Sequence, residues 1–296
     1  MEMITTETEL SRAGFYWRER DNVRALVCAP LEQDGFTNAF STRLGGTSPM
    51  PRDALNLAGF NDDAAENILE NRRRFLKLFE GPWTLTGCWQ THSASVRVVR
   101  SEQEAQPKPG VRGDADYCDA LVSRARKVLL AVKTADCVPV LACDPRSGAF
   151  AAIHAGWRGS LQSVALRALE LMQNQYGARP ADVSVAIGPA ARACCYEVGS
   201  EVVKAFKARF ADSESLFTPT TDGRARVDLP AANSQQLISA GVSAERIHVA
   251  PLCTMCLTDL FFSYRREKTL HGRVGRLMAV IGGAGVNGEK GKRGKG

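Results

Sequence analysis

Histidine is scarce in this chain of 296 residues, and long apolar runs are missing from it. Four residues are histidines, so a metal centre that needs many imidazoles cannot be built within one chain. No run reaches the roughly 18 apolar residues of a membrane-spanning helix. The first ten residues are acidic and polar, and they lack the basic start and apolar stretch of a secretory signal. These absences predict a cytoplasmic protein that does not associate with a membrane.

Cysteine, in contrast, occurs nine times, an odd number that rules out complete disulfide pairing within one chain. In the cytoplasm the thiols are expected to stay reduced, and most have the apolar surroundings of small core residues. The same interpretation is applied to the adjacent Cys194 and Cys195. It is also applied to the CxxC of Cys253 and Cys256, although a CxxC could instead be redox-active or bind zinc.

The net charge of +6 is unevenly distributed along the sequence. Residues 282–296 are rich in glycine and lysine. They contain four basic residues and one acidic residue, so their net charge of +3 is half of the total. Such a tail is expected to be disordered and solvated. No specific nucleic-acid partner is therefore predicted, and weak polyanion binding is the most that the tail suggests.

Apolar spacing predicts the regular elements of the chain. Helical spacing favours helices over residues 62–79 and 160–176 and from about Ser200. A further helix is expected after Asp228, with Pro230 in its first turn and Gly241 as its stop. Short apolar runs predict strands at residues 128–133, 138–143, 150–154, 183–188, 260–264 and 277–281. Loops are expected at residues 36–60 and 101–113. Clustered strands with irregularly interspersed helices predict one α+β domain over residues 1–281, with mixed β-sheet layers flanked by helices.

Three short segments carry side chains that are suited to binding a metal: Gln90-Thr91-His92-Ser93, Thr134-Ala135-Asp136-Cys137 and His154-Ala155-Gly156-Trp157-Arg158-Gly159. One thiolate and two imidazoles, from Cys137, His92 and His154, make a good zinc set and leave a fourth position open, as in catalytic sites. The glycines after His154 allow the backbone to approach a ligand closely. Spacing alone leaves the alternative that these are ordinary buried core residues.

These motifs also resemble one known family. His154-Ala-Gly-Trp-Arg-Gly, Thr134-Ala-Asp-Cys137, Gln90-Thr-His92 and Phe262-Ser-Tyr-Arg-Arg266 together look like the family once labelled multicopper polyphenol oxidase or laccase-like, also called the YfiH family. Further matches are Ser41-Thr-Arg-Leu-Gly-Gly46, Leu55-Asn-Leu57, Asp119-Ala-Leu121, Ile187-Gly-Pro189, Tyr196-Glu-Val198 and Cys253-Thr254. One departure is His271-Gly272-Arg273, where the family usually has Thr-Gly-Arg.

The resemblance implies a single α+β domain with zinc bound by His92, Cys137 and His154. It also implies purine nucleoside phosphorylase activity, with adenosine deaminase and methylthioadenosine phosphorylase activity. Some bacterial members are instead assigned to the editing of peptidoglycan precursors. Copper could occupy the same ligands, but the multicopper label conflicts with four histidines, because a laccase would need about ten.

Phosphorolysis requires a phosphate site, and arginine suits phosphate through bidentate hydrogen bonds. The candidates are Arg43, Arg158, Arg265 and Arg266, and Arg43 is favoured because Gly45 and Gly46 could let backbone amides join it. Each could equally form a structural ion pair. Gln90 could orient the base or a water molecule, and Trp157 could stack on a purine or belong to the core. Asp136 could transfer protons in catalysis or brace its loop.

Two other functions stay open from the sequence. Cys137 and His154 could form the nucleophile and base of an amide hydrolase, although such a dyad does not need His92. The alternative function without catalysis is that of a binding protein stabilised by zinc. The open fourth ligand position argues against this alternative. The predicted ligands are purine nucleosides and phosphate, and the sequence does not indicate an oligomeric state.

Overall fold

The computed structural model describes residues 6–50, 53–59, 63–106 and 117–283, and in these residues the strands form three sheets. The first sheet contains, in spatial order, β1 (Phe15–Arg20), β2 (Val23–Cys28), β3 (Phe36–Ser41), β15 (Leu277–Gly283), β7 (Val128–Thr134) and β4 (Thr84–Thr86). Its strands pair antiparallel except at one edge, where β4 runs parallel to β7.

The second sheet contains, in spatial order, β14 (Ile247–Val249), β10 (Ser184–Ile187), β8 (Val138–Cys143), β9 (Phe150–Ala155), β6 (Ala120–Ser123) and β5 (Val96–Val99). Both of its edge strands pair in parallel and the inner pairs are antiparallel. The third sheet is small and antiparallel, with the order β11 (Glu197–Val198), β13 (Ala225–Val227) and β12 (Phe217–Pro219).

The helices vary from single turns to more than three turns. They are α1 (Glu7–Arg12), α2 (Ala29–Gln33), α3 (Ala65–Leu76), α4 (Glu102–Ala105), α5 (Trp157–Leu161), α6 (Val164–Tyr176), α7 (Ser200–Arg209), α8 (Leu229–Ser239) and α9 (Tyr264–His271). Short 3-10 turns occur at Pro180–Asp182, Ser213–Leu216 and Ala244–Arg246. In the described part of the chain, no helix has the length and apolar character needed to cross a membrane.

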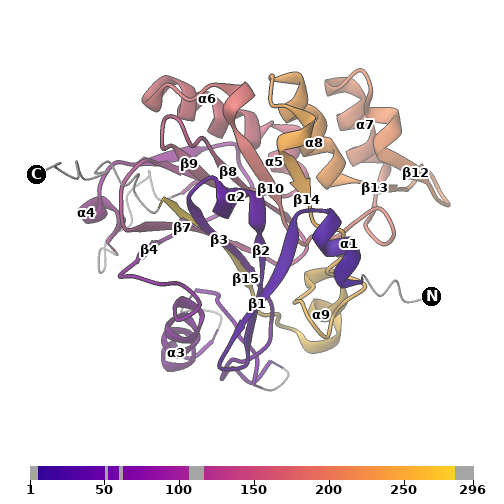
Figure 1. Cartoon of the computed structure of the whole chain (residues 1–296). Coiled ribbons are helices and arrows are strands. Elements are labelled where there is room, and N and C mark those ends of the chain that lie inside the picture. Colours follow the sequence, from indigo (N-terminus) through magenta and orange to yellow (C-terminus); the bar gives the residue numbers. More distant parts are fainter. Residues whose placement is uncertain (1–5, 51–52, 60–62, 107–116, 284–296) are drawn as a thin grey trace, which may run out of the picture.

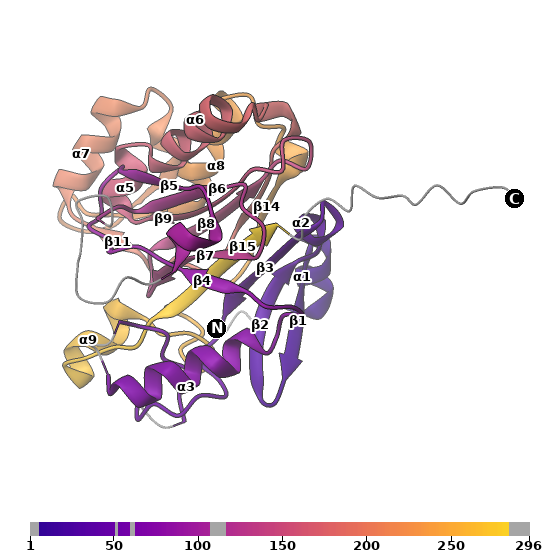
Figure 2. The same cartoon turned by 90° about the vertical axis from the view of Figure 1, so that its left-hand side faces the viewer.

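The two large sheets stack face to face, with helices on both outer sides (Figures 1 and 2). In Figure 2, α5, α6, α7 and α8 lie above the second sheet, while α3 lies below the first sheet. Strand alternation explains the layers, because successive side chains of a strand point to opposite faces. On β8, Leu141 and Cys143 belong to the core between the sheets, whereas Val138 and Val140 pack with the helices. This arrangement confirms the predicted α+β class of mixed sheets flanked by helices.

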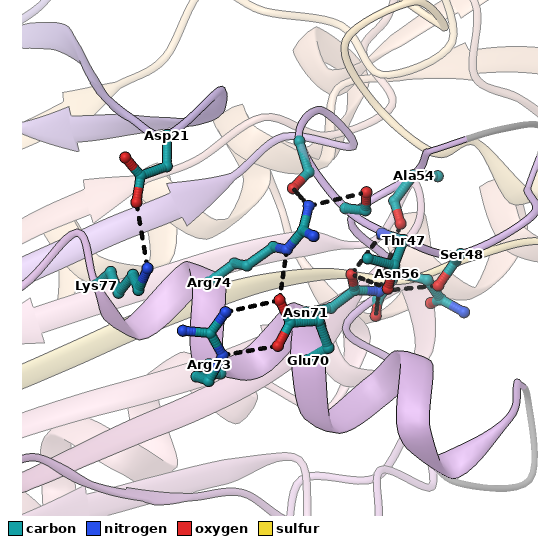
Figure 3. Close-up of polar contacts among 12 residues, drawn as sticks. Asp21, Thr47, Ser48, Ala54, Asn56, Glu70, Asn71, Arg73, Arg74 and Lys77 are labelled. Carbon is teal, nitrogen blue, oxygen red and sulfur yellow. Dashed lines mark hydrogen bonds and ion pairs between the residues drawn. The ribbon is translucent and has the colours of Figure 1, made fainter.

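Side chains of helix α3 hold the glycine-rich loop that follows β3 in place through hydrogen bonds (Figure 3). Asn71 is fully buried and accepts hydrogen bonds from the backbone N–H and the hydroxyl of Thr47. Its amide nitrogen donates to the Ser48 hydroxyl at 2.8 Å and to the Asn56 carbonyl at 3.0 Å. One turn further on, Arg74 donates to the carbonyls of the loop glycines, while Glu70 holds its guanidinium. The loop predicted at residues 36–60 thus begins with a strand, β3, and the part that contains Gly45 and Gly46 is tied to α3.

Several sequence predictions hold for the individual elements, and others need correction. The predicted helix over residues 160–176 is divided into α5 and α6, because Ser163 takes a left-handed φ of 62°. The predicted strand over residues 260–264 is wrong. Phe261 and Phe262 are buried, but they belong to the turn that leads into α9, and Ser263 caps this helix. The last strand continues to Gly283, two residues into the predicted tail. Residues 284–296 and most of the loop at 101–113 lie outside the described residues.

Candidate active site

Strand register brings Asp119, Cys137 and His154 together. In the β8–β9 pair, Pro139 lies opposite His154, so Cys137, which precedes β8, comes close to the end of β9. In the β6–β9 pair, Ala120 lies opposite Ile153, and the His154 N–H donates to the Asp119 carbonyl. A parallel bridge between Trp89 and Tyr117 then brings the segment of His92 alongside Asp119. Residues far apart in the sequence thus meet at the ends of three inner strands of the second sheet, β8, β9 and β6.

The predicted metal ligands form a compact cluster. The ligand atoms of His92, Cys137 and His154 all lie within 4.8 Å of one another, and Cys137 Sγ is 3.9 Å from His92 Nε2. The two imidazole rings meet edge to face with centroids 4.9 Å apart. Ligands at tetrahedral zinc distances would be separated by about 3.3–3.6 Å, so small rotations would bring all three onto one ion. His154 is buried whereas His92 is exposed, so the cluster opens on one side.

A buried carboxylate that sequence analysis did not select organises this cluster. Asp119 is fully buried and accepts a hydrogen bond of 2.8 Å from His154 Nδ1. It also accepts from the backbone N–H groups of Thr91, His92 and Ser93. A carboxylate on Nδ1 fixes the imidazole so that Nε2 faces a metal. The signal was present in the sequence, because Asp119 begins one of the motifs on which the family resemblance depends.

The electrostatics of the cluster favour ionised side chains. Burial alone would raise the pKa of the Cys137 thiol, but the two imidazoles lower that pKa to about 6. Burial would lower the pKa of His154, whereas Cys137 and Asp119 raise it to about 9. For Asp119, burial opposes ionisation, yet the hydrogen bonds from His154 and Ser93 hold its pKa well below the ordinary value. A cation that binds the thiolate would therefore release the imidazole proton.

The cluster lies in the wall of a cavity of about 650 Å³. This volume is within the usual range for small-molecule sites. Among the described residues, the aromatic part of the lining consists of Trp89, Trp157, Tyr196 and Tyr264. Its cationic part consists of Lys133, Arg158, Arg265 and Arg276. The wall combines flat apolar rings with positive charge, which suits a planar heterocycle that carries or reacts with an anion.

The predicted arginines separate into two groups. Arg158 and Arg265 line the cavity: the Arg158 guanidinium lies 4.2 Å from the Trp157 ring centroid, and Arg265 covers the Tyr196 ring. Arg43 and Arg266 are not among the described lining residues. Arg266 donates instead to the Met255 carbonyl and towards Cys195 Sγ.

Arg43, the favoured phosphate ligand from the sequence, occupies a structural position. It is 8% exposed, and it pairs with Glu267 at 2.9 Å. The guanidinium also donates to the carbonyls of Thr258 and Met50, and it stacks on the Phe262 ring. A phosphate ion at Arg43 would have to displace these buried partners, so the structure does not favour the expectation that this residue binds phosphate.

Gln90 and Asp136 line the cavity, but other groups already engage their polar atoms. The Gln90 amide forms two hydrogen bonds with the backbone of Lys133, which fixes the end of β7. The Asp136 carboxylate accepts from Thr254, Ser263 and the Arg265 N–H. Burial raises the pKa of Asp136, and these three donors oppose the shift. Of the two predicted roles, the contacts favour the one in which Asp136 braces its loop.

Three of the four cysteines in the two predicted pairs do not occupy the core positions that the sequence suggested. Cys194 and Cys256 are exposed, Cys195 is partly exposed, and only Cys253 of this group is buried. Their sulfur atoms form a second cluster within 4.8 Å of one another. The two pairs are 58 positions or more apart in the sequence, and no local pattern indicates that they meet.

Most of the chain matches a known protein family. A family model described as multi-copper polyphenol oxidoreductase laccase matches residues 37–283. The chain belongs to this family. A relative in Geobacillus stearothermophilus, purine nucleoside phosphorylase YlmD, is 34% identical over 261 residues, with 87% of this chain and 93% of the relative covered. Adenosine deaminase RL5, from an unknown prokaryotic organism, is 35% identical over 238 residues, with 79% and 90% covered.

Solved structures of the family have the same fold. The crystal structure of YlmD from Geobacillus stearothermophilus superposes with a TM-score of 0.81 at 32% identity and covers 92% of this chain and 99% of that one. The crystal structure of the hypothetical protein YfiH from Bacillus licheniformis gives a TM-score of 0.78 at 29% identity, covering 90% and 98%. These matches confirm the resemblance inferred from the motifs.

Proposed function

We propose that this protein is a zinc-dependent purine nucleoside phosphorylase that also deaminates adenosine and cleaves methylthioadenosine with phosphate. The observation that carries the proposal is the three-ligand cluster of His92, Cys137 and His154 in the wall of a cavity lined by aromatic rings and cations. The relatives support it, because they are named purine nucleoside phosphorylases and an adenosine deaminase.

The residues present fit a zinc ion. One thiolate and two imidazoles are the donors zinc prefers, and Gly156 leaves them room, since a Cβ there would lie 2.9 Å from Cys137 Sγ. Three protein ligands leave one coordination position for substrate or water. Zinc bound there would supply a Lewis acid to the reaction. Two histidines remain, His248 and His271, and neither belongs to a ligand cluster of the described residues, so a multicopper centre is not proposed.

Arg158 is the residue we assign to phosphate. It lies at the start of α5, lines the cavity and makes no ion pair within the described chain, whereas Arg265 is anchored to the Glu197 carbonyl. Its guanidinium could bind phosphate in a bidentate manner. The rings of Trp157 and Tyr196 would give the purine base an apolar wall, and Asp119 would hold His154 in the orientation that binds zinc.

Product analysis tests the proposal directly. The zinc-loaded protein should convert adenosine to inosine without phosphate, and with phosphate it should also form adenine and ribose 1-phosphate. Methylthioadenosine should yield adenine only when phosphate is present. Failure to turn over any of these nucleosides, together with a covalent Cys137 adduct formed by an amide substrate, would overturn the proposal in favour of a cysteine hydrolase.

An Arg158→Ala variant tests the phosphate assignment. Loss of a charge-assisted pair of hydrogen bonds, worth about 1.5–3 kcal/mol, should raise the KM for phosphate by roughly 10-fold to 100-fold. Adenosine deamination should change little, because it does not use phosphate. The matched control is Arg167→Ala, which removes an exposed arginine of α6. An unchanged KM for phosphate in Arg158→Ala would contradict the assignment.

A further inference from the structure

Four cysteines converge from two segments that are distant in the sequence. Cys194 and Cys195 lie in the turn before β11, and Cys253 and Cys256 lie between β14 and α9. Cys256 Sγ is 3.2 Å from Cys195 Sγ and 3.6 Å from Cys194 Sγ, and all four sulfur atoms lie within 4.8 Å of one another. All four thiols are free of disulfide bonds.

The backbone holds these two segments in a fixed register. Ala190 and Cys253 form a parallel bridge, and the Thr254 N–H donates to the Ala190 carbonyl at 3.1 Å. Each segment then forms its own turn: the Tyr196 N–H donates to the Arg192 carbonyl, and the Cys256 N–H donates to the Cys253 carbonyl. The convergence therefore follows from main-chain hydrogen bonds as well as from side-chain rotamers.

We propose that Cys194, Cys195, Cys253 and Cys256 form a tetrahedral Zn²⁺ site that is distinct from the cluster of His92, Cys137 and His154. Zinc–sulfur bonds of about 2.3 Å at tetrahedral angles place the sulfur atoms about 3.8 Å apart, close to the separations in the cluster. A disulfide needs about 2.05 Å and would pair the sulfur atoms two by two instead of gathering all four. A complete set of four thiolates leaves no open position, which is the arrangement of a structural site.

The surroundings fit the charge of such a site. Four thiols lose their four protons as four Zn–S bonds form, with no change in oxidation state, so the bound site carries a charge of −2. Arg266 directs a guanidinium nitrogen towards Cys195 Sγ at 3.9 Å and is held there by the Met255 carbonyl. Arg226 donates to the Cys194 carbonyl at 3.2 Å. Arg266 therefore faces a sulfur atom of the cluster and Arg226 contacts its backbone, and both positive charges would compensate for the charge of the thiolates.

The site has a structural consequence for the cavity. Tyr196, which follows Cys195, lines the cavity. Thr254, which follows Cys253, donates to the Asp136 carboxylate at 2.7 Å. A metal that joins the two segments would therefore fix one wall of the cavity and the loop that presents Cys137. The inference concerns metal binding and does not depend on the nucleoside chemistry.

Metal counting on the full chain tests this inference. Zinc-supplemented wild-type protein should retain about two zinc ions per chain after gel filtration, measured by elemental analysis. The Cys253→Ser/Cys256→Ser variant should retain about one, as should a His92→Ala/His154→Ala variant, and their combination should retain none. The control Cys28→Ala, a buried cysteine outside both clusters, should retain two. A folded Cys253→Ser/Cys256→Ser variant with the zinc content of the wild type would overturn the proposal.

A measurement on the wild type keeps the proposal testable if the serine variant fails to fold. Cobalt(II) added to metal-free protein should produce the intense sulfur-to-cobalt charge-transfer band and the visible bands of tetrahedral thiolate coordination. The intensity should correspond to four thiolates at one ion and a single thiolate at the other. Absence of the four-thiolate signature, or an intact mass lower by two hydrogens for each disulfide with no zinc bound, would refute the site.

Discussion

At the scale of single residues, the candidate active site depends on groups that orient the ligands as well as on the ligands themselves. Asp119 accepts hydrogen bonds from His154 Nδ1 and from the backbone that carries His92. Gly156 provides the space in which the Cys137 and His92 side chains approach each other. Two residues that do not bind the metal can therefore be altered to test how the cluster is built.

Replacing Asp119 with asparagine should weaken zinc binding by roughly 10-fold to 100-fold, the usual effect of losing a carboxylate that orients a histidine ligand. Competition with a chromogenic chelator measures this affinity. Asp144→Asn is the matched control, because Asp144 is also buried but caps the turn at the other end of the β8–β9 hairpin. Equal zinc affinity in the Asp119→Asn and control variants would show that Asp119 does not position the ligand.

Gly156→Ala should reduce zinc binding by a purely steric effect. The added Cβ would lie 2.9 Å from Cys137 Sγ and 3.1 Å from His92 Cδ2, and the φ of −68° accepts alanine without backbone strain. Zinc content after dialysis should fall well below that of Gly87→Ala, where the nearest atom to the new Cβ is 3.4 Å away. Full zinc retention in Gly156→Ala would mean that the cluster does not have the described geometry.

At the scale of elements, the sequence predicted the start of a helix correctly where a capping residue and a first-turn proline were both present. Helix α8 begins as predicted, because Asp228 accepts from the Ala231 N–H and Pro230 lies in the first turn. The strand predicted at residues 260–264 failed because burial of Phe261 and Phe262 comes from packing of a turn, which apolar periodicity does not distinguish from a strand. The other apolar runs did form strands, as β7, β8, β9, β10 and β15 show, so the run at 260–264 was the exception.

The α3 element offers a stability prediction. Asn71→Ala would leave the partly buried N–H of Thr47 and the buried carbonyl of Asn56 without their partner, and each unsatisfied buried group costs about 1–3 kcal/mol. The free energy of unfolding should fall by about 2–4 kcal/mol, measured by urea denaturation. The control Asn67→Ala, in the same helix, removes one hydrogen bond to Asp63 and should cost less than about 1 kcal/mol. Equal losses in the two variants would contradict the role of Asn71.

At the scale of the whole molecule, the motifs predicted the metal ligands but not how the other polar residues and cysteines are arranged in the fold. His92, Cys137 and His154 were identified from their types and from the family resemblance, and the fold brings them together. The position of Arg43 was not predictable, because its partners Glu267 and Thr258 are more than 200 positions away in the sequence. The cluster of four cysteines was missed because the bridge between Ala190 and Cys253, which brings Cys195 to Cys256, joins segments that are distant in the sequence.

The central claim is that one zinc cluster, assembled from three distant segments, carries the nucleoside chemistry. Cys137→Ala tests it most directly, with zinc content and ribose 1-phosphate formation from adenosine measured on the same preparation. We predict that the variant stays folded, lacks the zinc ion of this cluster and loses both phosphorolysis and deamination. A variant that keeps its full zinc content and forms ribose 1-phosphate at the wild-type rate would contradict the account.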